Sequence, residues 1–258
     1  MKLDLSGRSA LVTGSTAGIG FAAAKALADC GARVFVNGRD EGRTAEAAGR
    51  IAAGAQPVVG DVGTAQGCKA IHDATGPVDI LVNNAGIFEP ADFFDTDDET
   101  WDRHWQVNVM SAVRLSRAYA PAMIDKGWGR IVMLGSESAF NIPAEMIHYG
   151  VSKTADVAFA RGLAKRLAGT GVTVNSVLPG PTLSEGLEEM LADRAAQSDK
   201  PLKEVAADFV MENRPASIIQ RAAGVEEVAN MIAYVASPLS SATTGASLRV
   251  DGGVVDSL

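Results

Sequence analysis

The sequence predicts a doubly wound α/β fold, in which helices cover both faces of a mostly parallel sheet. Three observations support this prediction. Short apolar runs rich in β-branched residues alternate with longer stretches rich in Ala, Leu, Glu and Arg. The short runs are apolar on both faces, as strands of a parallel sheet covered on each side are. A glycine-rich loop directly follows the first run, where such folds turn from strand to helix.

Seven runs are expected to form the strands, and helical stretches lie between them. The strand candidates are Ala10–Val12, Val34–Val36, Val58–Val59, Ile80–Val82, Ile131–Leu134, Val172–Leu178 and Ser247–Val250. The helical candidates span residues 18–29, 41–53, 64–74, 98–123, 151–168 and 225–236. Apolar residues in 98–123 are spaced by three and four, so this helix should bury one stripe.

Residues 182–223 interrupt the alternation of strands and helices. Two short helices are expected there, at Leu183–Ala192 and Leu202–Glu212. An insertion of this length inside a compact domain is usually a lid or a binding loop. The chain shows no linker, repeat or low-complexity tract, so residues 1–258 should form a single domain. The segment 182–223 is expected to be a substrate-binding lid within that domain.

The composition argues against several classes of function. The chain has 23 basic and 31 acidic residues, a net charge of −8, which repels phosphate backbones and anionic membranes. Cys30 and Cys68 are too few for a disulfide scaffold and lack the spacing of a metal or redox motif. The N-terminal residues are too polar for a signal peptide, and no apolar run reaches the roughly 18 residues of a membrane span. We therefore expect a cytoplasmic protein without metal, nucleic-acid or membrane partners.

The glycine-rich loop predicts a nucleotide site. Its sequence is Thr13-Gly14-Ser15-Thr16-Ala17-Gly18-Ile19-Gly20. Glycines let backbone N–H groups approach a pyrophosphate at the positive end of a helix dipole. The loop lacks a Gly-Lys-Ser/Thr ending, so a P-loop ATPase or kinase is disfavoured.

Arg39 indicates which nucleotide the site prefers. It follows the second strand, where an acidic residue would bind a ribose 2′-hydroxyl and an Arg suits a 2′-phosphate. NADP is therefore favoured, and NAD stays the second candidate because Arg39 alone supports this choice.

Three side chains form a candidate catalytic group. Tyr149 and Lys153 are four positions apart and share one face of a helix. An ammonium near a phenol favours the phenolate, which lowers the pKa of the phenol from about 10. Ser136 follows the strand Ile131–Leu134 and should lie at the sheet edge where ligands bind.

Taken together, these motifs resemble those of the compact branch of the short-chain dehydrogenase/reductase family. They are Thr13-Gly14-x3-Gly18-x-Gly20, Asn83-Asn84-Ala85-Gly86, Asn108, Ser136, Tyr149-x3-Lys153 and Pro179-Gly180, in the family's order and spacing. The resemblance covers nearly the whole chain, which looks like the 3-oxoacyl reductases of this branch. It implies a Rossmann-type fold and an NAD(P)-dependent oxidoreductase. Such an enzyme transfers a hydride between nicotinamide and a small-molecule secondary alcohol or ketone. It also implies a homotetramer assembled through helices 98–123 and 151–168 and the C-terminal segment.

The resemblance also implies roles for the matched residues. Tyr149 would be the general acid/base, and Lys153 would lower its pKa and bind the nicotinamide ribose. Ser136 would polarise the carbonyl, and Asn108 would support a proton relay through water. The cofactor-binding residues would be Gly14, Ser15, Thr16, Gly18, Ile19, Gly20, Arg39, Asp61, Val62, Asn84, Ala85, Gly86, Tyr149, Lys153, Pro179, Gly180 and Thr182.

The chain departs from the family pattern at a few positions. Thr182 stands where an aliphatic residue is usual, and Ala17 stands where some NADP-dependent members have a basic residue. Gly127 and Thr170 replace basic residues of acyl-carrier-protein reductases, which weakens a role in fatty-acid synthesis.

The alternative to an enzyme is a catalytically inactive nucleotide-binding or sensing protein that kept the fold. The joint presence of Ser136, Tyr149 and Lys153 favours the enzyme. The residues leave the substrate open, although Glu137 and Glu145 would disfavour an anion if they point into the pocket.

Overall fold

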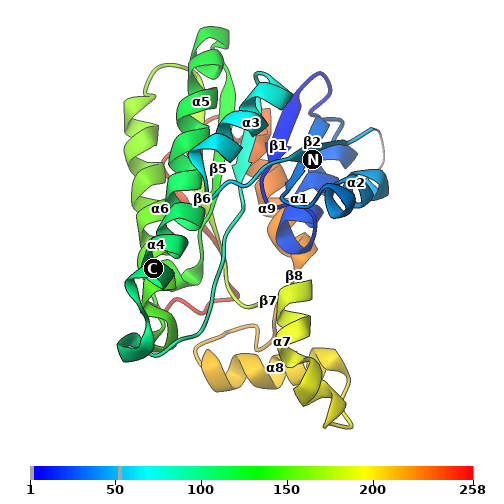
Figure 1. Cartoon of the computed structure of the whole chain (residues 1–258), viewed down its shortest axis with the longest axis vertical. Helices are drawn as coiled ribbons and strands as arrows, with labels where there is room; N and C mark the ends of the chain where they lie inside the picture. The colour runs from blue at the N-terminus through cyan, green and yellow to red at the C-terminus, as the bar shows by residue number, and fades with distance from the viewer. Residues whose placement is uncertain (1–2, 52–53, 258) are drawn as a thin grey trace.

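The computed structural model, which describes residues 3–51 and 54–257, places seven parallel strands in one sheet (Figure 1). The strands are β1 (Ser9–Val12), β2 (Arg33–Gly38), β3 (Gln56–Val59), β4 (Ile80–Asn83), β5 (Gly129–Leu134), β6 (Val172–Pro179) and β9 (Ser247–Val250). Their order in the sheet is β3-β2-β1-β4-β5-β6-β9. The order changes direction between β1 and β4, and ligands of doubly wound sheets bind at such a point. The predicted fold class is confirmed.

Six helices cover the two faces of the sheet. On one face lie α1 (Gly18–Asp29), α2 (Glu41–Arg50) and α9 (Val225–Ala236). On the other lie α3 (Ala65–Thr75), α5 (Ser111–Lys126) and α6 (Ile147–Arg166). Figure 1 shows α5 and α6 side by side on one side of the sheet and α1 and α9 on the other.

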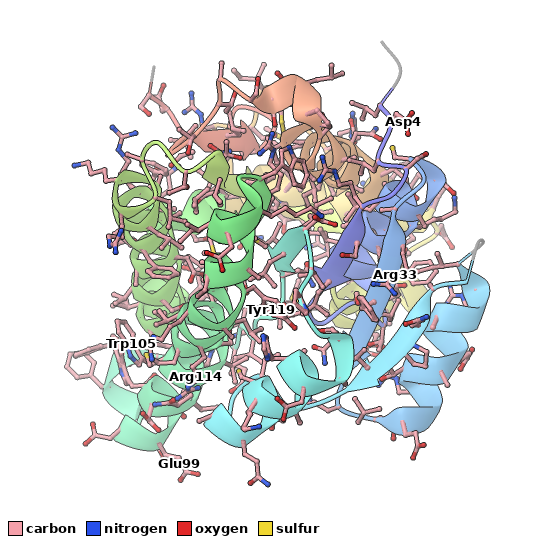
Figure 2. All side chains as sticks on the ribbon, turned by 90° about the horizontal axis from the view of Figure 1, so that it is seen from above. Asp4, Arg33, Glu99, Trp105, Arg114 and Tyr119 are labelled. Carbon is pink, nitrogen blue, oxygen red and sulfur yellow. The ribbon has the colours of Figure 1, made fainter. Side chains whose placement is uncertain are left out.

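The core is split by the sheet into two apolar layers. Successive residues of a strand point to opposite faces, so Ala10 and Val12 pack against α1 and α9 while Leu11 packs against α3 and α5. Tyr119 of α5 is fully buried in the second layer, and its hydroxyl lies 2.6 Å from Thr75 Oγ1. Burial raises the pKa of Tyr119 to about 12. Figure 2 labels Tyr119 among the side chains between the sheet and the helices of this layer.

Several helices differ from the sequence prediction. The stretch predicted as one helix at 98–123 is α4 (Asp98–His104), a π-helical turn (Trp105–Met110) and α5, because periodicity does not reveal a local change of helical winding. Helix α6 begins at Ile147 rather than 151, so Tyr149 and Lys153 belong to the same helix. The helix predicted at 41–53 ends at Arg50, and residues 52–53 lie outside the described residues.

The segment 182–223 forms a helical unit beyond the carboxyl edge of the sheet. It begins with β7 (Thr182–Leu183) and ends with β8 (Ala223–Gly224), and these two short strands pair in parallel. Between them lie α7 (Glu185–Ala196) and α8 (Leu202–Asn213), which pack on each other through Leu187, Leu191 and Ala206. Helix α7 starts two residues later than predicted because Leu183 belongs to β7. Figure 1 shows both helices standing apart from the sheet.

Two absences follow from the described part of the chain. None of its helices is long and apolar enough to cross a membrane. Within residues 3–51 and 54–257, no three His, Cys, Asp or Glu side chains gather as a metal site would require.

Candidate active site

A cavity of about 710 Å³ lies at the carboxyl edge of the sheet, between the loops that follow β1 to β6 and the helical unit 182–223. Parallel strands end at one edge, so residues far apart in sequence meet there. The predicted site residues that line it are Gly14, Thr16, Gly18, Ile19, Gly20, Arg39, Asp61, Val62, Asn84, Ala85, Gly86, Ser136, Tyr149, Lys153, Pro179, Gly180 and Thr182. Ser15 and Asn108 do not line it.

The glycine-rich loop fits an anionic group at the N-terminus of α1. Gly18 has a φ of +57°, which favours glycine, and Ala17 supplies no capping side chain. The N–H groups of Ile19 and Gly20 have no acceptor among the described residues. The Gly18 N–H donates to Glu185 Oε2 at 2.6 Å, so a carboxylate already occupies part of this positive helix end. A diphosphate has the charge and the acceptors for the same place.

Ser15 holds the loop in place from behind. It is fully buried, its hydroxyl donates to Val12 O at 2.7 Å, and it accepts from Asn37 N at 3.0 Å. The Ser15 N–H donates to Asn37 O at 2.9 Å and is therefore unavailable to a ligand. The backbone and side chain of Ser15 are both used to join β1 to β2. A direct diphosphate contact from Ser15 stays a prediction.

Asn37 is a structural residue that sequence reasoning passed over. Its Nδ2 donates to Val58 O and Gly60 O, both at 3.1 Å, and its Oδ1 accepts from Gly14 N at 3.3 Å. One buried amide therefore connects the ends of β1, β2 and β3. The only feature of the sequence that could have indicated this role is an Asn directly after the apolar run Val34–Val36.

Arg39 lies at the rim of the cavity, directly after β2. Its side chain is exposed, and its guanidinium has no ion-pair or hydrogen-bond partner among the described residues. A free guanidinium at this position can bind a phosphate with two parallel hydrogen bonds.

The loop after β4 is joined to the glycine loop. Asn84 Nδ2 donates to Thr13 O at 2.8 Å and to Gly14 O at 2.9 Å. Thr13 Oγ1 accepts from the backbone N–H groups of Asn84 and Ala85, both at 3.0 Å. A Cβ on Gly14 would lie 2.9 Å from Ala85 Cα, so the close approach of the two loops requires a glycine there.

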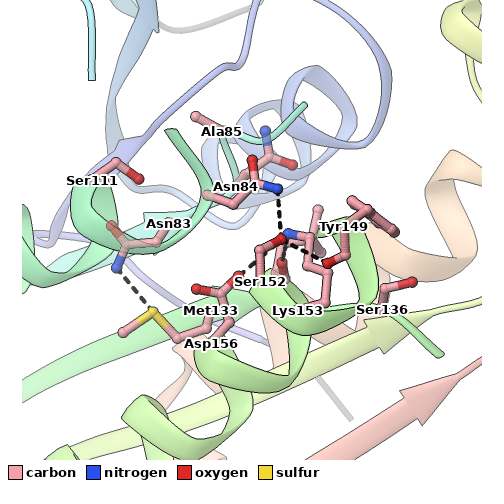
Figure 3. A network of polar contacts seen from close by, with 12 residues as sticks. Asn83, Asn84, Ala85, Ser111, Met133, Ser136, Tyr149, Ser152, Lys153 and Asp156 are labelled. Atoms are coloured by element: carbon pink, nitrogen blue, oxygen red, sulfur yellow. Dashed lines mark hydrogen bonds and ion pairs between the residues drawn. The ribbon is translucent and has the colours of Figure 1, made fainter. Parts of the chain in front are cut away.

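Tyr149, Lys153 and Ser136 meet on one wall of the cavity. Lys153 is almost fully buried, and its Nζ donates to Leu134 O at 2.8 Å, at the end of β5. The same Nζ lies 5.9 Å from the centre of the Tyr149 ring, one helical turn away on α6. Ser136 follows Leu134 by two residues, and its Oγ accepts from Ser138 N at 3.1 Å. Figure 3 shows these groups together with Asp156.

Asn108 lies behind this wall, in the π-helical turn. Its Oδ1 accepts from Ile87 N at 2.8 Å, and its Nδ2 donates to Ile87 O at 3.0 Å and to Ser152 Oγ at 2.9 Å. The Ser152 hydroxyl donates in turn to Tyr149 O at 2.7 Å. The amide therefore joins the loop after β4 to the helix that carries Tyr149.

Comparisons with known proteins agree with this geometry. The family model for short chain dehydrogenases matches residues 8–195. The uncharacterized oxidoreductase YvaG of Bacillus subtilis is 47% identical over 263 residues and covers 100% of both chains. D-beta-hydroxybutyrate dehydrogenase of Cupriavidus necator is 34% identical, over 97% of this chain and 99% of its own. The crystal structure of L-sorbose reductase from Gluconobacter frateurii, complexed with NADPH and L-sorbose, is 30% identical, with a TM-score of 0.93 over 100% of each chain.

The burial of Asp156 makes the stability of the fold depend on pH. Its Oδ2 lies 3.4 Å from Lys153 Nζ, yet burial raises the pKa of Asp156 from 3.8 to about 6. Because the folded-state pKa is raised, the stability contributed by the protonated carboxyl is fully present below about pH 4 and lost as pH rises through 6. Relative to Asp156→Asn, the natural protein should therefore lose about 2 kcal/mol between pH 4 and 7.

Urea unfolding of both proteins at several pH values between 4 and 7 measures this difference. Asp73→Asn, at an exposed carboxyl on α3, is the control and should show no such trend. A constant difference between the natural protein and Asp156→Asn would show that the carboxyl is ionised throughout.

Proposed function

The chain belongs to the short-chain dehydrogenase/reductase family of oxidoreductases, and we propose that it interconverts a ketone and a secondary alcohol with NADP(H). One observation carries the proposal. Ser136, Tyr149 and Lys153 line the same cavity as the glycine loop and the unpaired Arg39. A protein that only sensed a nucleotide could use Lys153 to bind it but would have no use for Ser136, Tyr149 and Lys153 together.

In the proposed reaction, NADP(H) supplies or accepts the hydride. The Tyr149 hydroxyl gives a proton to the substrate oxygen in the direction of reduction and takes it back in the direction of oxidation. The Ser136 hydroxyl donates a hydrogen bond to the same oxygen, where negative charge develops. The Lys153 ammonium beside the ring stabilises the tyrosinate that remains after proton transfer.

A proton path back to Tyr149 is also part of the proposal. Asn108, Ser152 and the Tyr149 backbone form a continuous set of hydrogen bonds behind the cavity. Gly86 lies between Lys153 and Asn108. A Cβ on Gly86 would be 3.4 Å from Lys153 Nζ and 3.5 Å from Asn108 Oδ1. In this proposal a water next to Gly86 passes a proton to Lys153, and anchoring that water is the relay role assigned to Asn108.

The helical unit 182–223 is proposed to be a lid. It is attached through the short β7–β8 pair, and α7 and α8 pack mainly on each other. Glu185 of this unit holds the Gly18 N–H at the proposed diphosphate site. A bound diphosphate repels this carboxylate, so cofactor binding and the position of the lid are coupled.

A homotetramer remains the proposed assembly. Support comes from apolar side chains exposed on the helices predicted to form its interfaces. Trp105 is 42% exposed and Val151 is 38% exposed, and Figure 2 shows Trp105 projecting away from the fold. Burying such side chains against a second copy is favourable.

Replacing Tyr149 by Phe should leave NADPH affinity unchanged and lower kcat by about 10² to 10⁴-fold, because no neighbouring group can donate the same proton. Steady-state absorbance of NADPH with the ketone that the natural protein reduces fastest measures kcat, and isothermal titration measures affinity. Tyr234→Phe, on α9 away from the cavity, should retain full activity. Normal turnover by Tyr149→Phe would disprove the assignment of the acid.

Replacing Arg39 by Asp should reverse the preference for NADPH over NADH. A charge-assisted contact to a 2′-phosphate contributes about 1.5–3 kcal/mol, which corresponds to about tenfold or more in affinity. The ratio of the two dissociation constants is the measurement. Arg43→Asp, at an exposed position on α2 that does not line the cavity, is the matched control. Equal affinities in the natural protein would contradict the NADP proposal.

Amide hydrogen exchange tests the lid. Residues 185–213 should exchange fast in the free protein and slow down when NADPH and a substrate alcohol or ketone are both bound, because closure excludes water from the reacting atoms. Amides of α9 serve as the internal reference. Equal protection of 185–213 in both states would make this unit a fixed part of the scaffold.

A further inference from the structure

A buried ion pair lies at the substrate end of the cavity. Glu137 directly follows Ser136, and its side chain is 4% exposed. Its Oε1 accepts from Nε of Arg214, the residue after α8, at 2.8 Å. Arg214 also lies 3.6 Å from Glu145 Oε1. All three residues line the cavity, and none has a part in the proposed hydride transfer.

This pair has unused hydrogen-bonding capacity on both sides. Glu137 Oε2 is buried and has no hydrogen-bond partner among the described residues. On Arg214, Nε donates to Glu137 and Nη1 donates to Asn213 O, whereas Nη2 donates to no described residue. Buried polar groups are nearly always paired in folded proteins. The missing partner of Glu137 Oε2 is therefore expected to come from the bound substrate, which can also accept from the free Arg214 Nη2.

The charge at this end of the cavity disfavours an anion. Glu137 and Glu145 carry two negative charges against the one positive charge of Arg214. Lys153 is already paired with Asp156, and Arg39 lies at the opposite end, after β2. A substrate carboxylate would meet a guanidinium whose charge is already compensated. A hydroxyl group, which both donates and accepts, satisfies the free Nη2 and the free Oε2 without adding charge.

Part of the wall of the same cavity is apolar. It includes Phe88, Leu187, Met190 and Phe209, and the Phe88 ring lies 6.2 Å from the Tyr149 ring. A carbon chain that carries hydroxyl groups presents C–H groups to such a wall and oxygens to the ion pair. An unsubstituted acyl chain would leave Glu137 Oε2 and Arg214 Nη2 without hydrogen-bond partners, which disfavours its binding.

We propose that the substrate is an uncharged polyhydroxylated ketone, or the corresponding polyol, and that Glu137 and Arg214 recognise hydroxyl groups near the reacting carbon. This inference rests on the proposed function, because the pair is assigned to the substrate site only through its position beside Ser136. In the reduction, the carbonyl carbon gains a hydride from NADPH, the C=O π bond becomes an O–H bond with the proton of Tyr149, and NADP⁺ is released.

Matched ketones test the substrate class. Ketoses of four, five and six carbons are each compared with the unsubstituted 2-ketone of the same length, and 3-oxobutanoate is included as the anion. We expect kcat/KM with NADPH to be at least 100-fold higher for the best ketose than for its unsubstituted counterpart. This comparison uses the natural protein alone, so it holds even if a variant fails to fold.

Variants then test the ion pair. In Glu137→Gln and Arg214→Met, the ratio of kcat/KM values for the ketose and the unsubstituted ketone should fall at least tenfold. Arg194→Met is the matched control, because Arg194 forms a similar pair with Glu212 on the outside of the same helical unit. Its ratio should equal that of the natural protein.

The outcomes separate the two proposals. A protein that reduces the unsubstituted ketones or 3-oxobutanoate best leaves the proposed function standing and overturns the substrate class. An unchanged ratio in both variants overturns the role of the pair. A protein that binds NADPH but reduces none of these compounds overturns the proposed function and this inference with it.

Discussion

The burial of one ammonium group sets the geometry of the whole site. A charge as buried as that of Lys153 must be paired, and its partners are Leu134 O on β5 and the Asp156 carboxylate on its own helix. These contacts fix the position of α6 relative to β5. Ser136 lies two residues beyond Leu134, and Tyr149 lies one helical turn before Lys153. The wall that carries the proposed chemistry is therefore a consequence of how this ammonium is satisfied.

Polar cross-links between loops hold the rest of the cavity in shape. Asn37 connects the ends of three strands, Thr13 and Asn84 join the loops after β1 and β4, and Asn108 joins the loop after β4 to α6. Each of these side chains uses its hydrogen bonds within the protein. The cavity wall is formed before any ligand arrives, so little conformational entropy is lost when the reacting groups are positioned.

The helical unit 182–223 contacts the body of the protein at both ends of the cavity. Glu185 accepts from Gly18 N at the proposed diphosphate site, and Arg214 pairs with Glu137 at the proposed substrate site. The first contact is exposed and the second is partly buried. The exposed contact would compete with the proposed anionic cofactor, whereas the partly buried contact anchors the unit beside Ser136. With this arrangement the proposed cofactor can displace the α7 end of the unit while the Arg214 end stays in contact with Glu137.

The local pattern of the sequence by itself determined the strand–helix alternation, the glycine loop before α1 and the shared helix face of Tyr149 and Lys153, and the structure agrees on each placement. These features depend on neighbours within about one helical turn or one strand, which periodicity and spacing describe. Tertiary structure alone decided the π-helical turn at Asn108, the burial of Ser15 and the pairing of Arg214 with Glu137, which are 77 positions apart. Such contacts form because buried polar groups need hydrogen-bond partners. The partners are distant in the sequence, so local spacing does not predict them.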